Sequence, residues 1–333
     1  MIDSDVLTAV TDDIFQVQIP LPFALRIVNC YLLRGDAGWT VVDTGLNTSK
    51  GRAAWQQAFA DLAIQPRKIE QIVLTHTHPD HYGLAGWLGE ICVADGGQLP
   101  SVYMSAREAE VARGVWVDGV MLKEKYRTFW EQCDVPDTLA QEIMDTTWQT
   151  RNGTLPHPIR HEIIGNGRAV RLGNRQMESI LMPGHSDGQL VFYDATDKLL
   201  LCGDHVLQKI TPNISLWPHG DPDPLGAYLA SLPELAQWDI RLALPGHGPM
   251  MEDVYGRMAE ITEHHQQRLQ ETIIALPGPS TVFEVSQRLF EHDNLSVHEM
   301  RFAATETLAH LDYLVQDGRV RQSDEFTWRF SLI

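Results

Sequence analysis

The sequence IEQIVLTHTHPDHYGL, at residues 69–84, decides how the rest of the chain is interpreted. Residues 69–74 (IEQIVL) are rich in β-branched side chains and predict a strand. Four side chains with metal-binding groups follow it in close succession: His76, His78, Asp80 and His81. Because alternate residues that leave a strand can point the same way, His76 and His78 can bind one ion together. Asp80 and His81 follow the turn at Pro79 and are placed to reach a second ion nearby.

Imidazole and carboxylate groups suit Zn²⁺ best, with Fe²⁺ and Mn²⁺ as alternatives. A tetrahedral ion needs more ligands than this motif offers for each metal, so other segments must supply them. Three further donors lie in loops at the predicted ends of strands: His185 in PGHS, Asp204 after LLLCG and His247 in LPGH. The ends of strands are where α/β sheets build their sites. We therefore predict a centre of two divalent metal ions.

Together with Asp43, these donors belong to an ordered series of motifs over roughly residues 10–250. The motifs are Asp43-Thr44-Gly45, His76-Thr77-His78-Pro79-Asp80-His81, Gly184-His185-Ser186, Gly203-Asp204 and Gly246-His247-Gly248. The series resembles the five motifs of the metallo-β-lactamase-fold metallohydrolase superfamily, in the glyoxalase-II-like or lactonase-like branch. The resemblance implies an α+β fold, a four-layer αβ/βα sandwich with the metals at one edge.

The resemblance also implies a role for each donor. His76, His78 and His185 would bind the first ion. Asp80, His81 and His247 would bind the second ion, and Asp204 would bridge the two. Asp43 would support the site by holding a metal ligand in position, because metal ligands generally need such outer partners.

Such a centre predicts a hydrolase. A water that bridges two cations loses a proton near neutral pH, and the hydroxide can attack a carbonyl carbon or a phosphorus. Asp80 is the predicted catalytic residue, because it can orient the hydroxide or transfer a proton. Relatives that perform oxygen chemistry carry Glu in place of His78 or do not use the second ion site, whereas this chain keeps every donor. The basic C-terminal pattern of glyoxalase-II-type thioesterases is not found.

The element pattern predicts a large domain and a small one. Expected strands lie at 25–33, 39–42, 69–74, 178–182 and 240–244, expected helices at 50–62, 225–238, 281–290 and 299–316, and a terminal hairpin at 319–322 and 327–331. We predict a catalytic domain at 1–255, a helix and linker at 256–280, and a winged-helix-like module at 281–333. Residues 106–150 form a predicted helical insertion rich in large side chains, among them Trp116, Met121 and Tyr126. Either it packs as a unit, or its inner face lines a pocket as a lid.

Three residues near the motifs are candidates for substrate contact: Tyr82, Tyr228 and His219, the last in a Pro-rich loop with Trp217. For each, an ordinary structural role is the alternative. His264 and His265 lie on a charged predicted helix and are expected to be solvated.

The charge balance disfavours nucleic acid as a substrate. The chain has 26 Lys and Arg against 44 Asp and Glu, a formal net charge of −18. Between Leu276 and Ile333 there are five arginines, nine acidic residues and no lysine, whereas a module that binds phosphates is normally basic. Packing or homodimer formation is therefore the favoured role of this module. Phosphodiester or single-stranded RNA hydrolysis remains the alternative function, and a non-catalytic metal-binding protein is a third.

The remaining features predict a cytoplasmic protein. The acidic N-terminus lacks the pattern of a secretory signal. No run approaches the roughly 18 apolar residues that span a bilayer, and the four cysteines form no CxxC pair. The expected partner is a small-molecule substrate, a carboxylic thioester, ester or lactone, with the insertion at 106–150 supplying an apolar acyl pocket.

Overall fold

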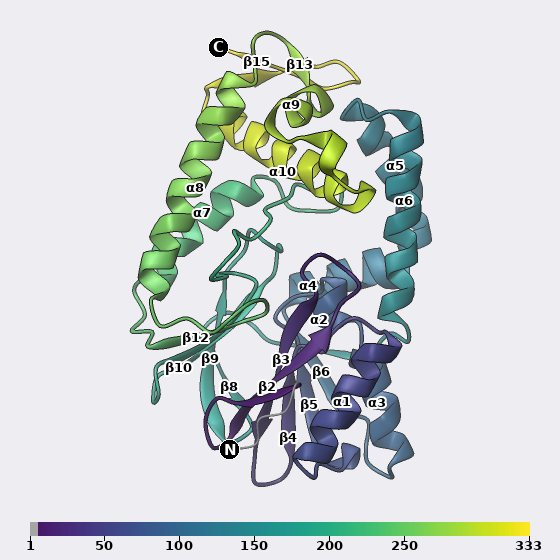
Figure 1. Ribbon diagram of the computed structural model, residues 1–333, viewed down its shortest axis with the longest axis vertical. Coiled ribbons are helices and arrows are strands. Elements are labelled where there is room, and N and C mark those ends of the chain that lie inside the picture. Colours follow the sequence, from purple (N-terminus) through teal and green to yellow (C-terminus); the bar gives the residue numbers. More distant parts are fainter. Residues whose placement is uncertain (1–5) are drawn as a thin grey trace.

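Two β-sheets face each other in the lower half of the molecule, and helices cover the outer face of each (Figure 1). The computed structural model describes residues 6–333, so the first five residues of the predicted catalytic domain lie outside the described residues. The first sheet follows chain order: β1 (Leu7–Ala9), β2 (Ile14–Pro20), β3 (Ile27–Arg34), β4 (Trp39–Val42), β5 (Ile69–Val73), β6 (Ser101–Met104) and β7 (His161–Ile163). The second has the order β12-β11-β10-β9-β8: β8 (Arg168–Leu172), β9 (Arg175–Leu181), β10 (Leu190–Asp194), β11 (Leu199–Gly203) and β12 (Leu242–Pro245).

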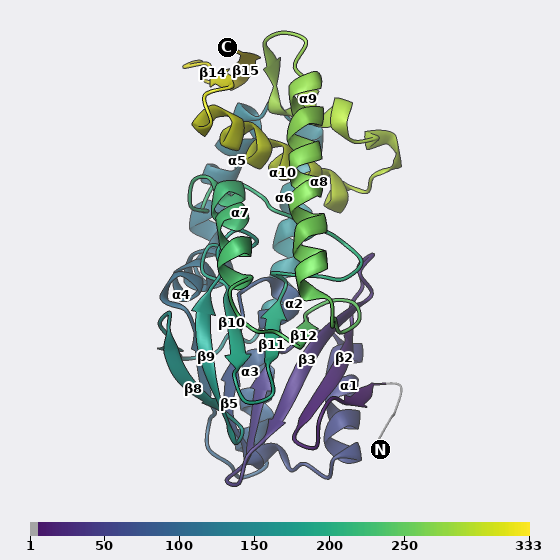
Figure 2. The same ribbon diagram turned by 90° about the vertical axis from the view of Figure 1, so that its left-hand side faces the viewer.

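Three apolar layers hold these elements together. One lies between the sheets and contains Leu33, Val73, Phe192 and Leu201. A second joins the first sheet to α1 (Ser49–Asp61) and α3 (Ala85–Ala94) through side chains such as Trp55 and Leu88. A third joins the second sheet to α7 (Pro224–Leu235) and α8 (Val254–Ile274), which Figure 2 shows in front. The result is the αβ/βα sandwich that the motif series implied.

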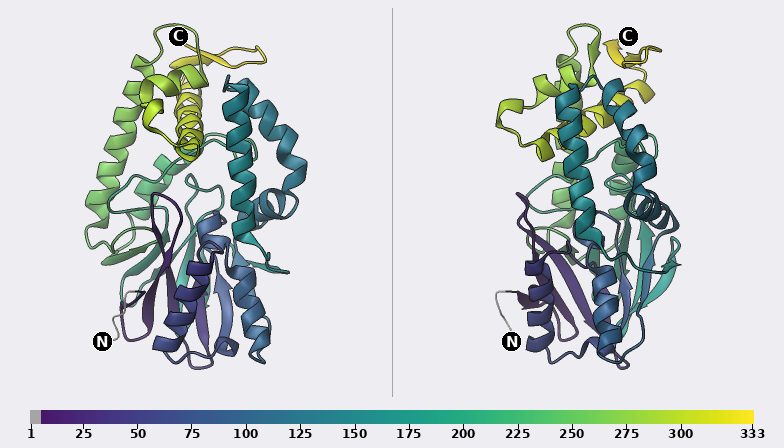
Figure 3. Two further views of the ribbon diagram at one scale, coloured as in Figure 1. Left: turned by 45° about the vertical axis from the view of Figure 1, so that its right-hand side comes forward. Right: turned by 90° about the vertical axis from the view of Figure 1, so that its right-hand side faces the viewer.

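Residues 106–150 form helices, as expected, and the longest of them rise above the sandwich toward the C-terminal helices (Figure 3, right). The elements are α4 (Ala106–Val111), a π-helical segment (Ala112–Val117), a 3-10 turn (Gly119–Leu122), α5 (Lys123–Gln132) and α6 (Asp137–Arg151), followed by a 3-10 turn (Asn152–Thr154). The side chain of Met121 is outside the described residues. Phe129 and Trp130 are buried in the same core as α7 and α8, so part of the insertion packs as a unit with its neighbours.

The C-terminal module consists of helices and a small sheet at the top of Figure 1. Its elements are β13 (Ser280–Thr281), α9 (Val282–Leu289), a 3-10 turn (His292–Asn294), α10 (Val297–Gln316), β14 (Val320–Gln322) and β15 (Arg329–Leu332). Capping boxes at Thr281 and Ser296 fix the starts of α9 and α10. The terminal hairpin was predicted, but the pairing of β13 with β15 was not.

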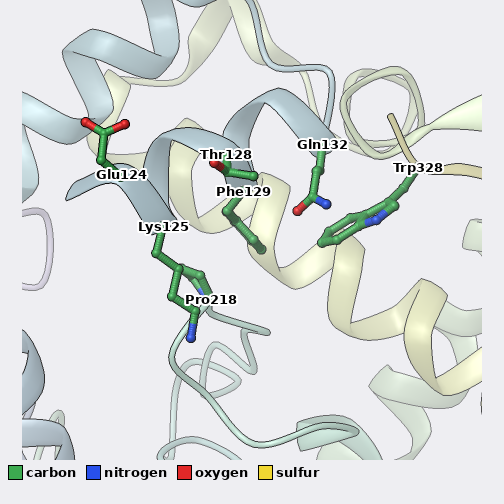
Figure 4. A pocket seen from close by; sticks show the side chains of 7 residues that line it. All are labelled: Glu124, Lys125, Thr128, Phe129, Gln132, Pro218 and Trp328. Carbon is green, nitrogen blue, oxygen red and sulfur yellow. The ribbon is translucent and has the colours of Figure 1, made fainter. Parts of the chain in front are cut away.

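Backbone hydrogen bonds and an aromatic contact join the insertion to the C-terminal module. The Trp328 amide donates to the Gln132 carbonyl at 2.9 Å, and the Phe283 amide donates to the Cys133 carbonyl at 3.1 Å. Trp328 also meets Phe129 edge to face, with ring centroids 6.0 Å apart. These residues lie beside a surface pocket between α5 and the C-terminal strands (Figure 4), which none of the predicted metal ligands lines.

The sequence expectation for His265 is wrong. This side chain is buried, and its Nδ1 lies 3.3 Å from Nε2 of His310 on α10. The long helix α8 packs against the C-terminal module here, which charge patterning alone did not reveal. Among the described residues, no helix is both long enough and apolar enough to cross a membrane.

Candidate metal centre

The seven predicted donors meet at one edge of the sandwich, because the strands that precede them end there. β4 and β5 are parallel, as are β11 and β12, so their carboxyl ends lie at a common edge. Hydrogen bonds between the sheets close this edge: the Leu190 amide donates to the Thr75 carbonyl, and Tyr31 Oη donates to the Pro245 carbonyl. The donor loops are thus held by both sheets.

Two groups of three donors match the two sets that the family resemblance implied. His76, His78 and His185 form one, and Asp80, His81 and His247 form the other, with the donor atoms of each within 4.8 Å of one another. Asp204 lies between them: its Oδ2 is 3.5 Å from His185 Nε2, 3.4 Å from His81 Nε2 and 3.4 Å from His247 Nε2. This central position suits a carboxylate that bridges two ions.

Outer partners orient the imidazoles so that Nε2 faces the centre. His81 Nδ1 donates to Asp43 Oδ2 at 2.8 Å, His185 Nδ1 to the Asn213 carbonyl at 2.9 Å, and His247 Nδ1 to the Ile27 carbonyl at 2.7 Å. Asp43 also accepts from the Thr75 amide and hydroxyl, both at 2.8 Å. Such partners fix the tautomer and the ring orientation of metal ligands.

The chemistry of the donor set fits divalent cations. Within residues 6–333, His81 Nε2, His185 Nε2, His247 Nε2 and Asp204 Oδ1 are buried and have no hydrogen-bond partner. Burial lowers the pKa of His78 to about 3, which keeps that ring in the neutral form that binds metals. Burial also disfavours charge on His247, but Asp204 and Asp80 raise its pKa to about 10. The two carboxylates therefore favour positive charge at this edge.

Gly246 leaves no room for a side chain beside this centre. An added Cβ would collide with Asp204 Oδ1 and would lie 2.6 Å from His81 Cε1. Gly246→Ala is therefore expected to displace two donors and to lower the metal content of the purified protein, with little loss of fold. The measurement is elemental analysis beside thermal unfolding. Gly278→Ala, where a Cβ meets no atom within 4 Å, is the control; full metal content in Gly246→Ala would show that the donors do not need this close approach.

Glu108, on α4 of the insertion, contacts both loops of the first donor group, a position that the sequence did not reveal. Its fully buried carboxylate accepts from the Thr77 amide and hydroxyl with one oxygen, and from Ser186 Oγ and the Gly188 amide with the other. Thr77 lies between two donors and Ser186 follows a third. Glu108 thus ties the two loops that carry the first group of histidines.

A cavity of about 340 Å³ opens above the donors. His78, Asp80, His185, Asp204 and His247 lie in its wall, and apolar side chains line much of the rest, including Val111, Val115, Trp116, Leu207, Ile210 and Phe302. The inner face of the insertion therefore lines a pocket, which was one of the two alternatives that the sequence left open. The start of α10 lines it as well, a contribution from the C-terminal module that was not expected.

The structure separates the three candidates for substrate contact. His219 lines the cavity, stacks on Trp217 and lies 2.9 Å through Nδ1 from Tyr126 Oη. Tyr82 and Tyr228 are fully buried, and neither lines the cavity. Tyr82 packs beside His157 and His161, and the Tyr228 hydroxyl donates to the His205 carbonyl at 2.7 Å.

Comparisons with known proteins agree with this geometry. The sequence profile of the Metallo-beta-lactamase superfamily matches residues 24–247, and that of the Metallo-beta-lactamase-like, C-terminal domain matches residues 269–333. The chain is 29% identical over 316 residues to the probable metallo-hydrolase YqjP of Bacillus subtilis, covering 91% of this chain and 92% of that protein. It is 23% identical over 258 residues to the atrochrysone carboxyl ACP thioesterase of Aspergillus fumigatus, covering 77% and 62% of the two chains.

A solved structure is similar over both the sandwich and the C-terminal module. The metallo-beta-lactamase family protein TTHA1429 from Thermus thermophilus superposes with a TM-score of 0.87 at 32% identity, covering 98% of this chain and 100% of that one. The arrangement of the module on the sandwich is therefore shared with a relative.

Proposed function

The chain belongs to the metallo-beta-lactamase superfamily, and we propose that it is a dinuclear metal-dependent hydrolase of carboxylic thioesters, esters or lactones. The observation that carries this proposal is the convergence of seven donors, with unpartnered imidazole nitrogens, beneath a largely apolar cavity. The ions would be held by His76, His78 and His185 on one side and by Asp80, His81 and His247 on the other. Asp204 would serve both, and we favour Zn²⁺ on the basis of the donor types.

Bound divalent ions would supply two kinds of chemistry here, a water acidic enough to act as a nucleophile at neutral pH and a Lewis acid for the substrate oxygen. The chain's own groups do the rest. Asp80 lines the cavity and is the carboxylate that we propose orients the attacking water or passes a proton to the leaving group. The apolar wall would bind the acyl chain and exclude water from it.

The composition of the cavity wall favours an acyl substrate over RNA. Single-stranded nucleic acid is bound through several phosphates, each of which needs a cationic partner. Among the described residues that line the cavity, Arg301 is the only lysine or arginine. The similarity to a protein named as an ACP thioesterase points in the same direction.

Metal analysis together with a substrate panel tests this function. We expect close to two ions per chain, by analogy with the two donor groups. Acyl thioesters, lactones and aryl esters should be hydrolysed, whereas bis(p-nitrophenyl) phosphate and short RNA should not. A metal content near zero after careful loading would overturn the assignment of the centre. RNA cleavage without acyl hydrolysis would overturn the substrate class.

A further inference from the structure

Arg301 on α10 is an unusual cation for its surroundings. It comes from the C-terminal module, which as a whole is acidic, yet its side chain lines the cavity of the metal centre. The guanidinium lies over the rings of Phe302 and Trp217, with the Arg301 Cζ atom 4.5 Å and 5.5 Å from their ring centroids. These two rings meet edge to face, with their centroids 6.1 Å apart, so the cation packs against an aromatic corner of the cavity wall.

This guanidinium has few polar partners. Nη1 donates to Thr147 Oγ1 at 3.2 Å, and Nη2 lies 3.4 Å from His298 Nδ1. Nε is buried without a hydrogen-bond partner, and within residues 6–333 no carboxylate lies within 4 Å of the side chain. Burial lowers the pKa of Arg301 to about 10, so the group still carries its charge at neutral pH.

Two other arginines show what this chain does with a partly buried guanidinium. Arg175 is bound by Asp13, Asp194 and Asp197, and Arg107 is bound by Asp187 and Asp221. Burying a charge is costly unless an opposite charge and hydrogen bonds compensate for it. A purely structural role for Arg301, tying α10 to α6 through Thr147, would account for one nitrogen and leave the guanidinium without a carboxylate partner.

We propose that Arg301 binds an anionic group carried by the substrate, at a place in the cavity separate from the bond that is cleaved. The inference rests on the proposed function and deepens it: the substrate would join an apolar body to a carboxylate or a phosphate. Guanidinium forms paired hydrogen bonds to both of these groups. The anion could belong to the acyl part of the substrate or to its leaving group. Substrates that carry the anion on one part or the other distinguish these two cases.

The test compares substrates that differ only in the anion. The S-glutaryl and S-pentanoyl thioesters of N-acetylcysteamine share the reacting bond and the leaving group but differ by a distal carboxylate. Pentanoyl phosphopantetheine places a phosphate on the leaving group instead, and its neutral counterpart is pentanoyl pantetheine, which lacks only that phosphate. For the wild-type enzyme, one of the two anionic substrates should show a KM about 10- to 100-fold below that of the neutral thioester, as expected for a charged hydrogen bond.

Variants of Arg301 test whether this side chain causes the preference for the anionic substrate. Arg301→Gln should remove the preference: the KM of the anionic substrate should rise about 10- to 100-fold more than the KM of the neutral thioester. Arg301→Lys should keep part of it, because the charge remains but the planar fork is lost. Arg321→Gln, an exposed arginine of the same module, is the matched control and should change neither value. A merely structural role would raise the KM of both substrates alike.

A binding measurement keeps this inference separate from the proposed function. Thioether analogues of the same substrates, with CH₂ in place of the reacting carbonyl, cannot be hydrolysed and can be titrated by calorimetry into the metal-loaded enzyme. Tighter binding of an anionic analogue that is lost in Arg301→Gln would support the anion site even if no thioester were turned over. Equal binding of all analogues by the wild type, or a preference that persists in Arg301→Gln, would overturn it.

Discussion

His78→Ala is expected to abolish turnover while leaving the chain folded. His78 lies in both the first donor group and the cavity wall, so its removal would take away one of the three side chains proposed to hold the first ion. A catalytic ion contributes several kcal/mol of transition-state stabilisation, which corresponds to a loss of about 10³-fold or more in kcat/KM. The measurements are kcat/KM with the best substrate of the panel and the metal content of the same preparation.

The fold should survive this substitution, because His78 contributes little to the core. The side chain is only partly buried, and its ring contacts His76 and His185, which are themselves donors. The backbone carbonyl of His78, which accepts from the His81 and Tyr82 amides, is kept in the variant. Circular dichroism should therefore show a native melting transition. Full activity in His78→Ala would mean that hydrolysis does not use this centre.

His264→Ala is the matched control. This imidazole lies on α8, outside both donor groups, and is only partly buried. Its removal should leave kcat/KM and metal content unchanged. Loss of activity in both variants would point to general destabilisation rather than to a missing ligand.

The donors could be predicted from the sequence because their signal is local. An apolar strand followed by alternating histidines indicates a site by itself, and His185, Asp204 and His247 each follow a strand that could be recognised. Parallel pairing then brings these strand ends together without further information. The same reasoning placed β4 at residues 39–42, and it placed β5 to within one residue.

Residues whose roles depend on distant packing could not be predicted. Tyr82 directly follows the motif, but the turn of α2 (Pro79–Tyr82) directs its side chain into the core. Arg301 lies 54 residues beyond His247, the nearest donor in the sequence, and the packing of α10 brings it to the cavity. Net charge averages over all residues of the acidic C-terminal module and therefore hides Arg301, which faces the cavity.

Glu108 shows the same limit and leads to the second large expected effect. In the sequence it is one of three polar residues in the short helix AREAEV, with nothing to distinguish it from Glu110. In the structure Glu108 is fully buried and Glu110 is exposed. Burial raises the pKa of Glu108, while the four hydrogen bonds to its oxygens oppose that rise. A carboxylate is the side chain that can accept all four at once.

Glu108→Gln is therefore expected to impair the centre although it is nearly isosteric. The amide NH₂ would replace one accepting oxygen. The Thr77 or Ser186 hydroxyl could rotate to accept from it, but the Thr77 or Gly188 backbone amide on that side would lose its acceptor. A buried donor left without a partner costs about 1–3 kcal/mol of unfolding free energy. Because both loops carry metal ligands, we also expect kcat/KM to fall by about 10²-fold, the cost of a small misplacement of catalytic groups.

The test compares Glu108→Gln with Glu110→Gln and the wild type. For each protein we would measure the free energy of unfolding by denaturant, the metal content and kcat/KM. Glu110 forms a single exposed ion pair with Arg107, with 3.5 Å between Nη1 and Oε2, and such pairs contribute little to stability. Glu110→Gln should therefore match the wild type in all three measurements. If Glu108→Gln lost stability but kept full activity, the carboxylate would only pack α4 against the sandwich. If it lost activity and metal while remaining folded at assay temperature, the insertion would be shown to hold the donor loops in place.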